Sequence, residues 1–219
     1  MLKSSKSRLT RKQLSFFPSD TLFDKIARAV CRAEVLPAKE LFEAWEVARR
    51  VRRKWRGGRV VDFASGHGLL SHIMLILDDS SAEAVAVDSD FPQNASTLSQ
   101  SIIDTWPRLT GRIHYVETSI EDFEITPDDM VLAIHACGTL TDRVLEKAVK
   151  AGAQVAVLPC CQDIGLSETG GLEGWIDGPL AVDIIRATHL RAEGYSVITR
   201  LIPEEITPKN RLLMGCPGK

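Results

Sequence analysis

This chain of 219 residues lacks a long apolar run, an export signal, a disulfide framework and internal repeats. No apolar stretch approaches the roughly 20 residues that a membrane-spanning helix needs. The start, Met1 to Lys6, lacks the apolar core of a secretory signal. Five cysteines, an odd number, favour reduced thiols. We therefore expect a cytoplasmic protein with no membrane partner.

The charges are unevenly distributed along the chain. Residues 1–59 hold 16 lysines and arginines against 6 aspartates and glutamates, whereas the remainder holds 11 against 23. Such a split favours a basic surface for a polyanion, or two oppositely charged parts that dock on each other. The length allows one domain with a large core and a small appendage.

Hydrophobic patterning predicts three parts: a basic tail over 1–19, a helical N-terminal cap over 20–57 and one α/β domain over 58–219. In the last part, apolar runs predict strands at 59–63, 84–88, 112–116, 130–135 and 153–158, with helices at 69–77, 92–104, 141–150 and 179–192. Two final runs, 195–202 and 211–214, have no helix between them, so one strand near the C-terminus should be antiparallel. The expected fold class is α/β, with a Rossmann-like, doubly wound, mostly parallel sheet.

One strand, loop and helix indicate a nucleoside cofactor. The first strand carries Asp62 and leads into a loop of small residues, Ala64 to Gly68, in front of a helix. Backbone N–H groups of such a loop can approach a ligand closely, and ligands of open α/β sheets bind at this edge. The next strand ends in Asp88, whose carboxylate can accept both hydroxyls of a ribose.

Asp62 separates two candidate cofactors. A carboxylate here repels a pyrophosphate but attracts an ammonium group such as the amine of S-adenosylmethionine. A dinucleotide fingerprint also requires a third glycine where this chain has Ser71. The pattern favours S-adenosylmethionine, and an NAD(P)-dependent oxidoreductase is the rival.

These residues resemble the first two motifs of class I S-adenosylmethionine-dependent methyltransferases. The family's acid-x-Gly-x-Gly-x-Gly motif matches Asp62-x-Ala64-x-Gly66-x-Gly68, and Asp88 matches the second motif. Ala64 in place of the first glycine requires, in this interpretation, a backbone φ below zero. The resemblance implies cofactor contacts from Asp62, Ala64, Ser65, Gly66, Gly68 and Asp88, with Ser119, Ile120 and Asp122 lining the adenine.

A narrower resemblance rests on two further strand ends. His135-x-Cys137-Gly138 with Thr141-Asp142, and Pro159-Cys160-Cys161, are similar to a branch that includes the eukaryotic tRNA acceptor-stem 2′-O-methyltransferase. This resemblance implies an RNA substrate, tRNA or rRNA, with Cys137 and Pro159 beside it. Unlike that enzyme, the chain continues as Cys-Cys-Gln-Asp and has no zinc-finger spacing.

Three roles compete for the cysteines. Cys160 or Cys161 can attack C6 of a pyrimidine, given a lowered thiol pKa. Alternatively, His135, Cys137, Cys160 and Cys161 can bind zinc, but two adjacent cysteines should not easily face one tetrahedral ion, so we assign no metal. The third role is apolar packing under the substrate.

His135 is a candidate for a direct part in the reaction. An imidazole at this strand end can contact the cofactor and can position or deprotonate an acceptor hydroxyl or amine. A purely structural histidine is the alternative.

Charged residues on two predicted helices are substrate candidates. Asp183 and Arg186, three apart on one helix, can hold substrate or form an ordinary surface pair. Four arginines of the cap can contact RNA phosphates, although basic residues late in a helix also complement its dipole, and an acidic protein is another partner. These four are Arg49, Arg52, Arg53 and Arg56.

We therefore predict an S-adenosylmethionine-dependent methyltransferase that acts on RNA. The alternatives are the oxidoreductase, a catalytically silent RNA-binding module with this fold, and a methyltransferase with a protein substrate.

Overall fold

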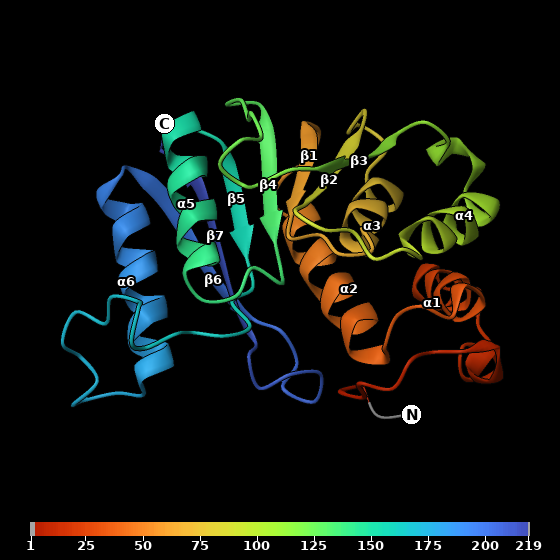
Figure 1. The fold of residues 1–219 in the computed structure, drawn as a ribbon, viewed down its shortest axis with the longest axis horizontal. Helices are drawn as coiled ribbons and strands as arrows, with labels where there is room; N and C mark the ends of the chain where they lie inside the picture. Colours follow the sequence, from red (N-terminus) through yellow and green to blue (C-terminus); the bar gives the residue numbers. More distant parts are fainter. Residues whose placement is uncertain (1–2, 219) are drawn as a thin grey trace.

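Seven strands form one sheet in the order β3-β2-β1-β4-β5-β7-β6 in the computed structural model, which describes residues 3–218 (Figure 1). Strands β1 to β5 are parallel to one another, and β7 is antiparallel to both β5 and β6. This confirms the predicted α/β fold with one antiparallel strand near the C-terminus. The strands are β1 (Arg59–Phe63), β2 (Ala84–Asp88), β3 (Ile113–Glu117), β4 (Asp129–Ala133), β5 (Gln154–Val157), β6 (Tyr195–Leu201) and β7 (Arg211–Pro217).

Side chains alternate along each strand, so the sheet has two apolar faces. Val60 and Leu132 pack on one face with residues of four helices, whereas Val61 and Val131 pack on the other. The first face is covered by α1 (Leu22–Ala33), α2 (Ala38–Arg52), α3 (Leu69–Leu77) and α4 (Ala95–Thr105). The second is covered by α5 (Thr139–Ala151) and α6 (Gly178–Ala192), beside each other in Figure 1.

The two N-terminal helices share a hydrophobic core with the sheet. Ile26 of α1 and Val47 of α2 are fully buried in the same cluster as Val60 of β1. The preceding segment holds a short 3₁₀ helix, η1 (Arg11–Phe16), and buries Leu9 and Phe17 in that cluster. The division into tail, cap and domain stays a prediction.

Most boundaries differ from the predicted ranges by a few residues. Helix α4 begins at Ala95, after Pro92 and the N-cap Asn94, rather than at residue 92. Strand β4 ends at Ala133, before the predicted 135, so His135 lies in the loop that follows it. A second 3₁₀ turn, η2 (Pro107–Leu109), connects α4 to β3. Within residues 3–218, no helix combines the length and apolar character needed to span a membrane.

The carboxyl ends of the parallel strands meet at one edge of the sheet, drawn at the bottom of Figure 1. Helix α2 begins at this edge and runs toward the opposite one, where it leads into β1. Residues of the N-terminal segment pair with the start of α2, since the N–H of Leu9 donates to the carbonyl of Leu36 and that of Lys39 donates to the carbonyl of Ser5. The carboxyl edge therefore gathers the loops after β1, β4 and β5 and the beginning of α2.

Candidate active site

Asp62 is a buried carboxylate with one oxygen left free. It is 1% exposed, and its Oδ2 accepts hydrogen bonds from the Ser71 N–H and hydroxyl at 3.3 and 3.0 Å. Its Oδ1 has no hydrogen-bond partner within residues 3–218. Burial raises the pKa of Asp62 to about 7, against the hydrogen bonds from Ser71. A cationic ligand at Oδ1 would stabilise the ionised form.

Asp62, whose Oδ1 is unpaired within the described residues, lines a small cavity. The hydroxyl of Ser65 lines the same cavity and is likewise buried without a partner in the described part of the chain. Buried polar atoms are nearly always paired in folded proteins. Two unpaired oxygens at one cavity therefore fit a ligand with several N–H donors, such as an α-ammonium group.

The glycines of the loop leave room for different neighbours. A Cβ on Gly66 would meet no atom of the described residues within 4 Å, whereas one on Gly68 would lie 2.9 Å from the hydroxyl of Tyr115. That hydroxyl donates to the carbonyl of His67 at 3.0 Å. The Gly66 N–H donates to Oδ2 of Asp88 at 2.8 Å. Tyr115 and Asp88 thus hold the loop, and Gly66 leaves space for a ligand.

The prediction for Ala64 is wrong. Its φ is +51°, in the left-handed region that disfavours residues with a Cβ. The chain turns sharply here so that the Ser65 N–H can donate to the carbonyl of Val87 at 3.3 Å.

Ser119 and Asp122 are bonded to each other after β3. The Ser119 hydroxyl donates to Oδ2 of Asp122 at 2.7 Å and accepts from its N–H at 3.1 Å, while Ile120 packs into the core. This turn orients the Asp122 carboxylate. The contacts of these residues with an adenine stay a prediction.

Two residues from other elements complete the cavity. Glu40, in the first turn of α2, lines it, and burial raises the pKa of Glu40, with a further contribution from Glu43. His135, after β4, also lines it, and burial, followed by the charge of Lys39, lowers the pKa of His135 to about 4. The imidazole is therefore neutral at neutral pH, as a hydrogen-bond acceptor must be. Sequence reasoning identified His135 but missed Glu40, because no local signal brings α2 to this edge.

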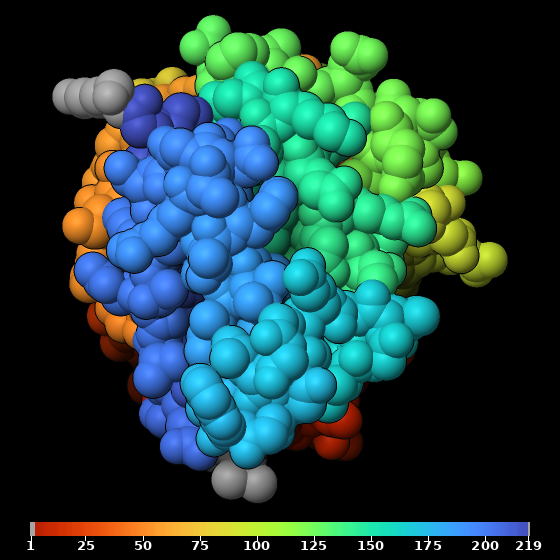
Figure 2. All heavy atoms as spheres, turned by 90° about the vertical axis from the view of Figure 1, so that its left-hand side faces the viewer, coloured from red at the N-terminus to blue at the C-terminus, as the bar shows by residue number. Residues whose placement is uncertain are grey.

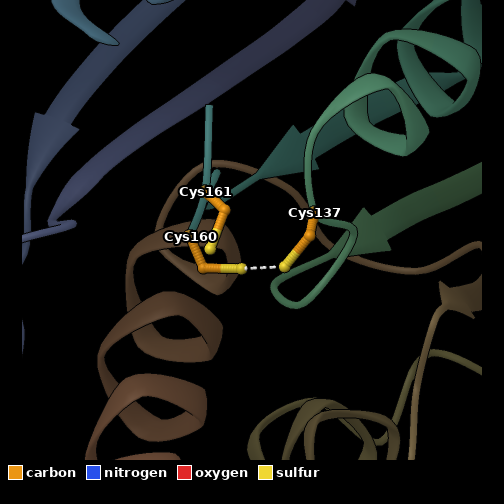
Figure 3. A group of neighbouring side chains, drawn as sticks. All are labelled: Cys137, Cys160 and Cys161. Atoms are coloured by element: carbon orange, nitrogen blue, oxygen red, sulfur yellow. Dashed lines mark hydrogen bonds between the residues drawn. The ribbon is translucent and has the colours of Figure 1, made fainter. Parts of the chain in front are cut away.

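Cys137, Cys160 and Cys161 lie together at the carboxyl edge of the sheet (Figure 3). The sulfur of Cys137, from the loop after β4, lies 2.6 Å from that of Cys160, and the sulfur of Cys161 completes a group within 4.8 Å. The Gly138 N–H joins the two loops by donating to the carbonyl of Cys161 at 2.8 Å. The two adjacent cysteines thus belong to one group that could hold a metal ion, an arrangement that the sequence argument disfavoured. Within residues 3–218, His135 does not belong to this group.

The surroundings of the thiols argue against two of the predicted roles. Cys137 and Cys161 are exposed, so they are not apolar packing groups under a crevice; Pro159, by contrast, is buried. Burial raises the pKa of Cys160, whereas a cysteine nucleophile requires a lowered one, and the nucleophilic role of Cys161 stays a prediction.

Asp183 and Arg186 belong to an internal network rather than to a surface pair. Arg186 is 4% exposed; its guanidinium binds both carboxylate oxygens of Asp142 at 2.6 and 2.9 Å and the carbonyl of Gly138 at 3.0 Å. Asp183 accepts from Arg186 at 3.3 Å and from Gln162 at 3.0 Å. These contacts hold both cysteine loops in place. Because Arg186 is buried, it is not available for a direct contact with substrate.

The arginines of the cap lie at the other edge of the sheet. Arg52 is 3% exposed and binds Asp78 at 3.1 Å and the Ser81 hydroxyl at 2.8 Å, so it is not available to a phosphate. Arg49 pairs with Glu46, and Arg56 with Asp78, whereas Arg53 is exposed. At about 1.5 Å per residue, the helix carries Arg52 about 18 Å from Glu40. The expected basic flank beside the cleft is therefore wrong.

Comparison with known proteins agrees with this geometry. A family model described as "Methyltransferase domain" matches residues 39–165, more than half of the chain, so the chain belongs to this family. Its cofactor is S-adenosylmethionine, as predicted, and the unpaired oxygens of Asp62 and Ser65 fit the cofactor's amine. The oxidoreductase alternative is not supported.

Curated relatives carry the description "Glutathione S-transferase C-terminal domain-containing protein". The Drosophila melanogaster homologue is 28% identical over 201 residues, which cover 73% of this chain and 33% of the relative. The human protein is 23% identical over 201 residues, which cover 74% of this chain and 30% of the relative. The chain thus spans about a third of the length of the curated relatives it matches.

Solved structures share the fold. An O-methyltransferase family protein from Burkholderia thailandensis superposes with a TM-score of 0.52 at 18% identity, over 99% of this chain and 65% of that one. A putative RNA methyltransferase from Pyrococcus horikoshii gives a TM-score of 0.52 at 16% identity, over 84% and 87%. The class I methyltransferase fold is therefore confirmed, and the narrower likeness to the tRNA enzyme stays a prediction.

Proposed function

We propose that this chain transfers the methyl group of S-adenosylmethionine to an acceptor on RNA. The observation that carries the methyl-transfer part is the cavity at which Asp62 and Ser65 present unpaired buried oxygens within residues 3–218 and which His135 also lines. When bound, S-adenosylmethionine supplies an electrophilic methyl group on its sulfonium.

The residues around the cavity would orient the reactants. Asp62 and Ser65 would hold the amine, and Asp88 would hold the ribose beside Gly66. Apolar Leu36, Leu69 and Ile134 line the rest of the cavity and would exclude water. Methyl transfer from a sulfonium depends chiefly on alignment of the acceptor, which His135 can assist by accepting a hydrogen bond.

The acceptor would enter along a groove beside the cysteines. This groove, of about 700 Å³, is lined by Cys137 and Cys161 and by the start of the long segment after β5. The segment, cyan in Figure 2, covers part of the surface beside α6 and exposes Trp175 by 88% and Leu166 by 75%. Exposed aromatic rings are platforms on which unpaired bases stack.

Basic residues of the N-terminal segment would supply phosphate contacts. Lys6 and Arg8 are exposed, and Arg8 forms a β-bridge with Pro37, next to Leu36 of the cavity wall. Contacts of this kind add affinity that depends on salt but not on base sequence. They replace the arginines of α2 in this proposal.

The proposal is tested by incubating the chain with radiolabelled S-adenosylmethionine and an extract of cells that lack this protein, followed by separation of RNA, protein and small molecules. We expect the label in RNA. Label confined to protein or small molecules would refute the RNA acceptor. An RNA affinity that survives Asp62→Ala, with no label transferred to any fraction, would identify a silent RNA-binding module instead.

A matched pair of variants tests the stacking surface. Trp175→Ala should raise the KM for RNA about 10-fold, equivalent to the 1–3 kcal/mol typical of a stacked base, and should leave the affinity for the cofactor unchanged. Phe16→Ala is the control, because Phe16 is an exposed aromatic residue (54%) in η1, apart from the segment after β5. Equal KM values for the two variants would remove Trp175 from the RNA surface.

A further inference from the structure

We propose that Cys137, Cys160 and Cys161 form a binding site for a soft divalent cation, Zn²⁺, with three thiolate ligands and a fourth position that opens onto the acceptor groove. The sulfurs come from two loops that are 23 residues apart in sequence, and all lie within 4.8 Å of one another. In Figure 3 the sulfurs of Cys137 and Cys160 face each other, and the sulfur of Cys161 lies beside them.

The donor set matches zinc chemistry. Thiolates select zinc and other soft ions over magnesium or calcium, and zinc binds them tetrahedrally at about 2.3 Å. A disulfide would use two of the sulfurs and leave the third without a role. Three neighbouring thiols can share one ion, if Cys137 and Cys160 move apart from 2.6 Å to the roughly 3.7 Å that tetrahedral zinc requires.

A second layer of contacts holds the ligand loops in place. Gly138 has φ +58° and ψ −131°, a conformation essentially restricted to glycine, which lets its N–H reach the carbonyl of Cys161. Its carbonyl accepts from Arg186, which Asp142 and Asp183 hold in turn. The Thr141 hydroxyl donates to the carbonyl of Ala136. Supporting contacts of this kind orient ligands before a metal binds.

The number of ligands indicates an open site. Within residues 3–218, the group contains these three thiols and no histidine or carboxylate. Structural zinc sites are closed by four protein ligands, whereas catalytic ones keep three and leave a position for water or substrate. Here Cys137 and Cys161 line the groove that also holds Asp163 and Leu166. An oxygen or nitrogen atom of a ligand in the groove can therefore complete the coordination of the ion. That this ligand is the methyl acceptor rests on the proposed function.

Metal binding is measured without any assay of activity. The full chain is purified reduced and metal-free, dialysed against Zn²⁺, and analysed for bound metal. We expect one equivalent per chain, and, with Co²⁺ in place of Zn²⁺, thiolate charge-transfer absorption together with intense tetrahedral bands. Less than half an equivalent, or octahedral Co²⁺ without charge transfer, would overturn the site.

Serine variants identify the ligands. Cys137→Ser, Cys160→Ser and Cys161→Ser should each weaken Zn²⁺ binding by at least about 10-fold. Cys216→Ser is the matched control, since Cys216 is a partly exposed free thiol near the end of β7, at the opposite edge of the sheet. Unchanged affinity in the first three variants, or an equal loss in the control, would refute the assignment.

A further measurement guards against misfolding. Each variant must keep the thermal stabilisation by S-adenosylhomocysteine shown by the unaltered chain, because the cofactor cavity does not include the thiols. If a serine variant loses this stabilisation, Arg186→Lys replaces it, and we expect weakened Zn²⁺ binding with cofactor stabilisation retained. Unchanged Zn²⁺ affinity in Arg186→Lys would then count against the proposal. Failure of metal binding leaves the proposed function standing, since the two are measured separately.

Discussion

Asp62 and Asp78 are both buried carboxylates beside α3, at opposite edges of the sheet, but only one of them is satisfied. Asp78 binds the guanidinium of Arg52 at 3.1 Å and accepts from the Gly57 N–H at 2.9 Å and from the Ser80 hydroxyl at 2.8 Å. Burial opposes ionisation, yet these hydrogen bonds and the charge of Arg52 hold the pKa of Asp78 below its usual value. Within residues 3–218, Ser71 is the one residue that donates to Asp62, and the pKa of Asp62 is raised.

This difference between Asp78 and Asp62 distinguishes a structural carboxylate from one that is available to a ligand. A buried charge that the protein neutralises with its own groups stabilises the fold only as long as both partners remain. A buried carboxylate that the protein leaves half-paired lowers stability until a ligand arrives. The amino edge of the sheet is therefore a structural junction, and the carboxyl edge is prepared for a cation.

The largest expected effect comes from breaking the satisfied pair. Arg52→Ala should lower the free energy of unfolding by about 3–5 kcal/mol, because Asp78 would stay buried with only the exposed Arg56, at 3.6 Å, as a charged partner. Urea denaturation measures this value. Arg53→Ala, one residue further on and exposed, should change it by less than about 0.5 kcal/mol. Similar losses in the two variants would contradict the structural role of Arg52.

Neutralising the half-paired carboxylate of Asp62 should weaken cofactor binding and remove the cost of burying an unpaired charge. Asp62→Asn keeps an acceptor for Ser71 but loses the charge, and we expect about 100-fold weaker binding of S-adenosylmethionine, or about 3 kcal/mol. Isothermal titration calorimetry provides the affinity. Ser119→Ala, which alters the opposite end of the predicted cofactor site without removing a charge, should have a much smaller effect.

The difference in stability between Asp62→Asn and the unaltered chain should depend on pH. The pKa of Asp62 is raised from 3.8 to about 7 in the folded state, so the folded protein binds the proton more tightly than the unfolded chain. Its contribution to stability is therefore lost as pH rises from about 4 to about 7. Asp62→Asn should be more stable than the unaltered chain at pH 8, and this advantage should vanish toward pH 4. A difference that does not change with pH would show that Asp62 has an ordinary pKa.

A smaller effect concerns the affinity of the unaltered chain. The cofactor's amine should lower the pKa of Asp62, so binding releases a proton when the pH is below about 7. Affinity should then fall by up to about 10-fold per pH unit below pH 7 and level off above it. Calorimetry in buffers of different ionisation enthalpy measures the proton release. Asp62→Asn should show neither the pH dependence of cofactor affinity nor the proton release.

The smallest effect is expected at Ala64. Its φ of +51° disfavours a Cβ, so Ala64→Gly should raise the free energy of unfolding by about 0.5–1 kcal/mol despite the greater freedom of glycine in the unfolded chain. Ala187→Gly, inside α6, should instead lower it by about 1 kcal/mol. If both variants are destabilised equally, the loop is not strained at Ala64.

The sequence by itself determined the sheet, the glycine loop and the cofactor. Alternating apolar runs and helical periods are local patterns, and they placed β1, α3 and β2 at their observed bounds. Asp62 and Gly66 were recognisable because a strand, a turn of small residues and a helix are consecutive in the chain. The sequence also identified Cys137, Cys160 and Cys161, and a shared zinc site with His135 was one of the three roles that it offered.

Only the tertiary structure decided which distant groups meet. The direction of α2 across the sheet brought Glu40 to the cavity and carried Arg52 to the opposite edge, although the two residues lie on one helix. The pairing of β4 with β5 brought the loops of Cys137 and Cys161 together, and Arg186 reached across from α6 to hold them. Such contacts depend on the packing of elements far apart in sequence, which periodicity and motif spacing do not encode.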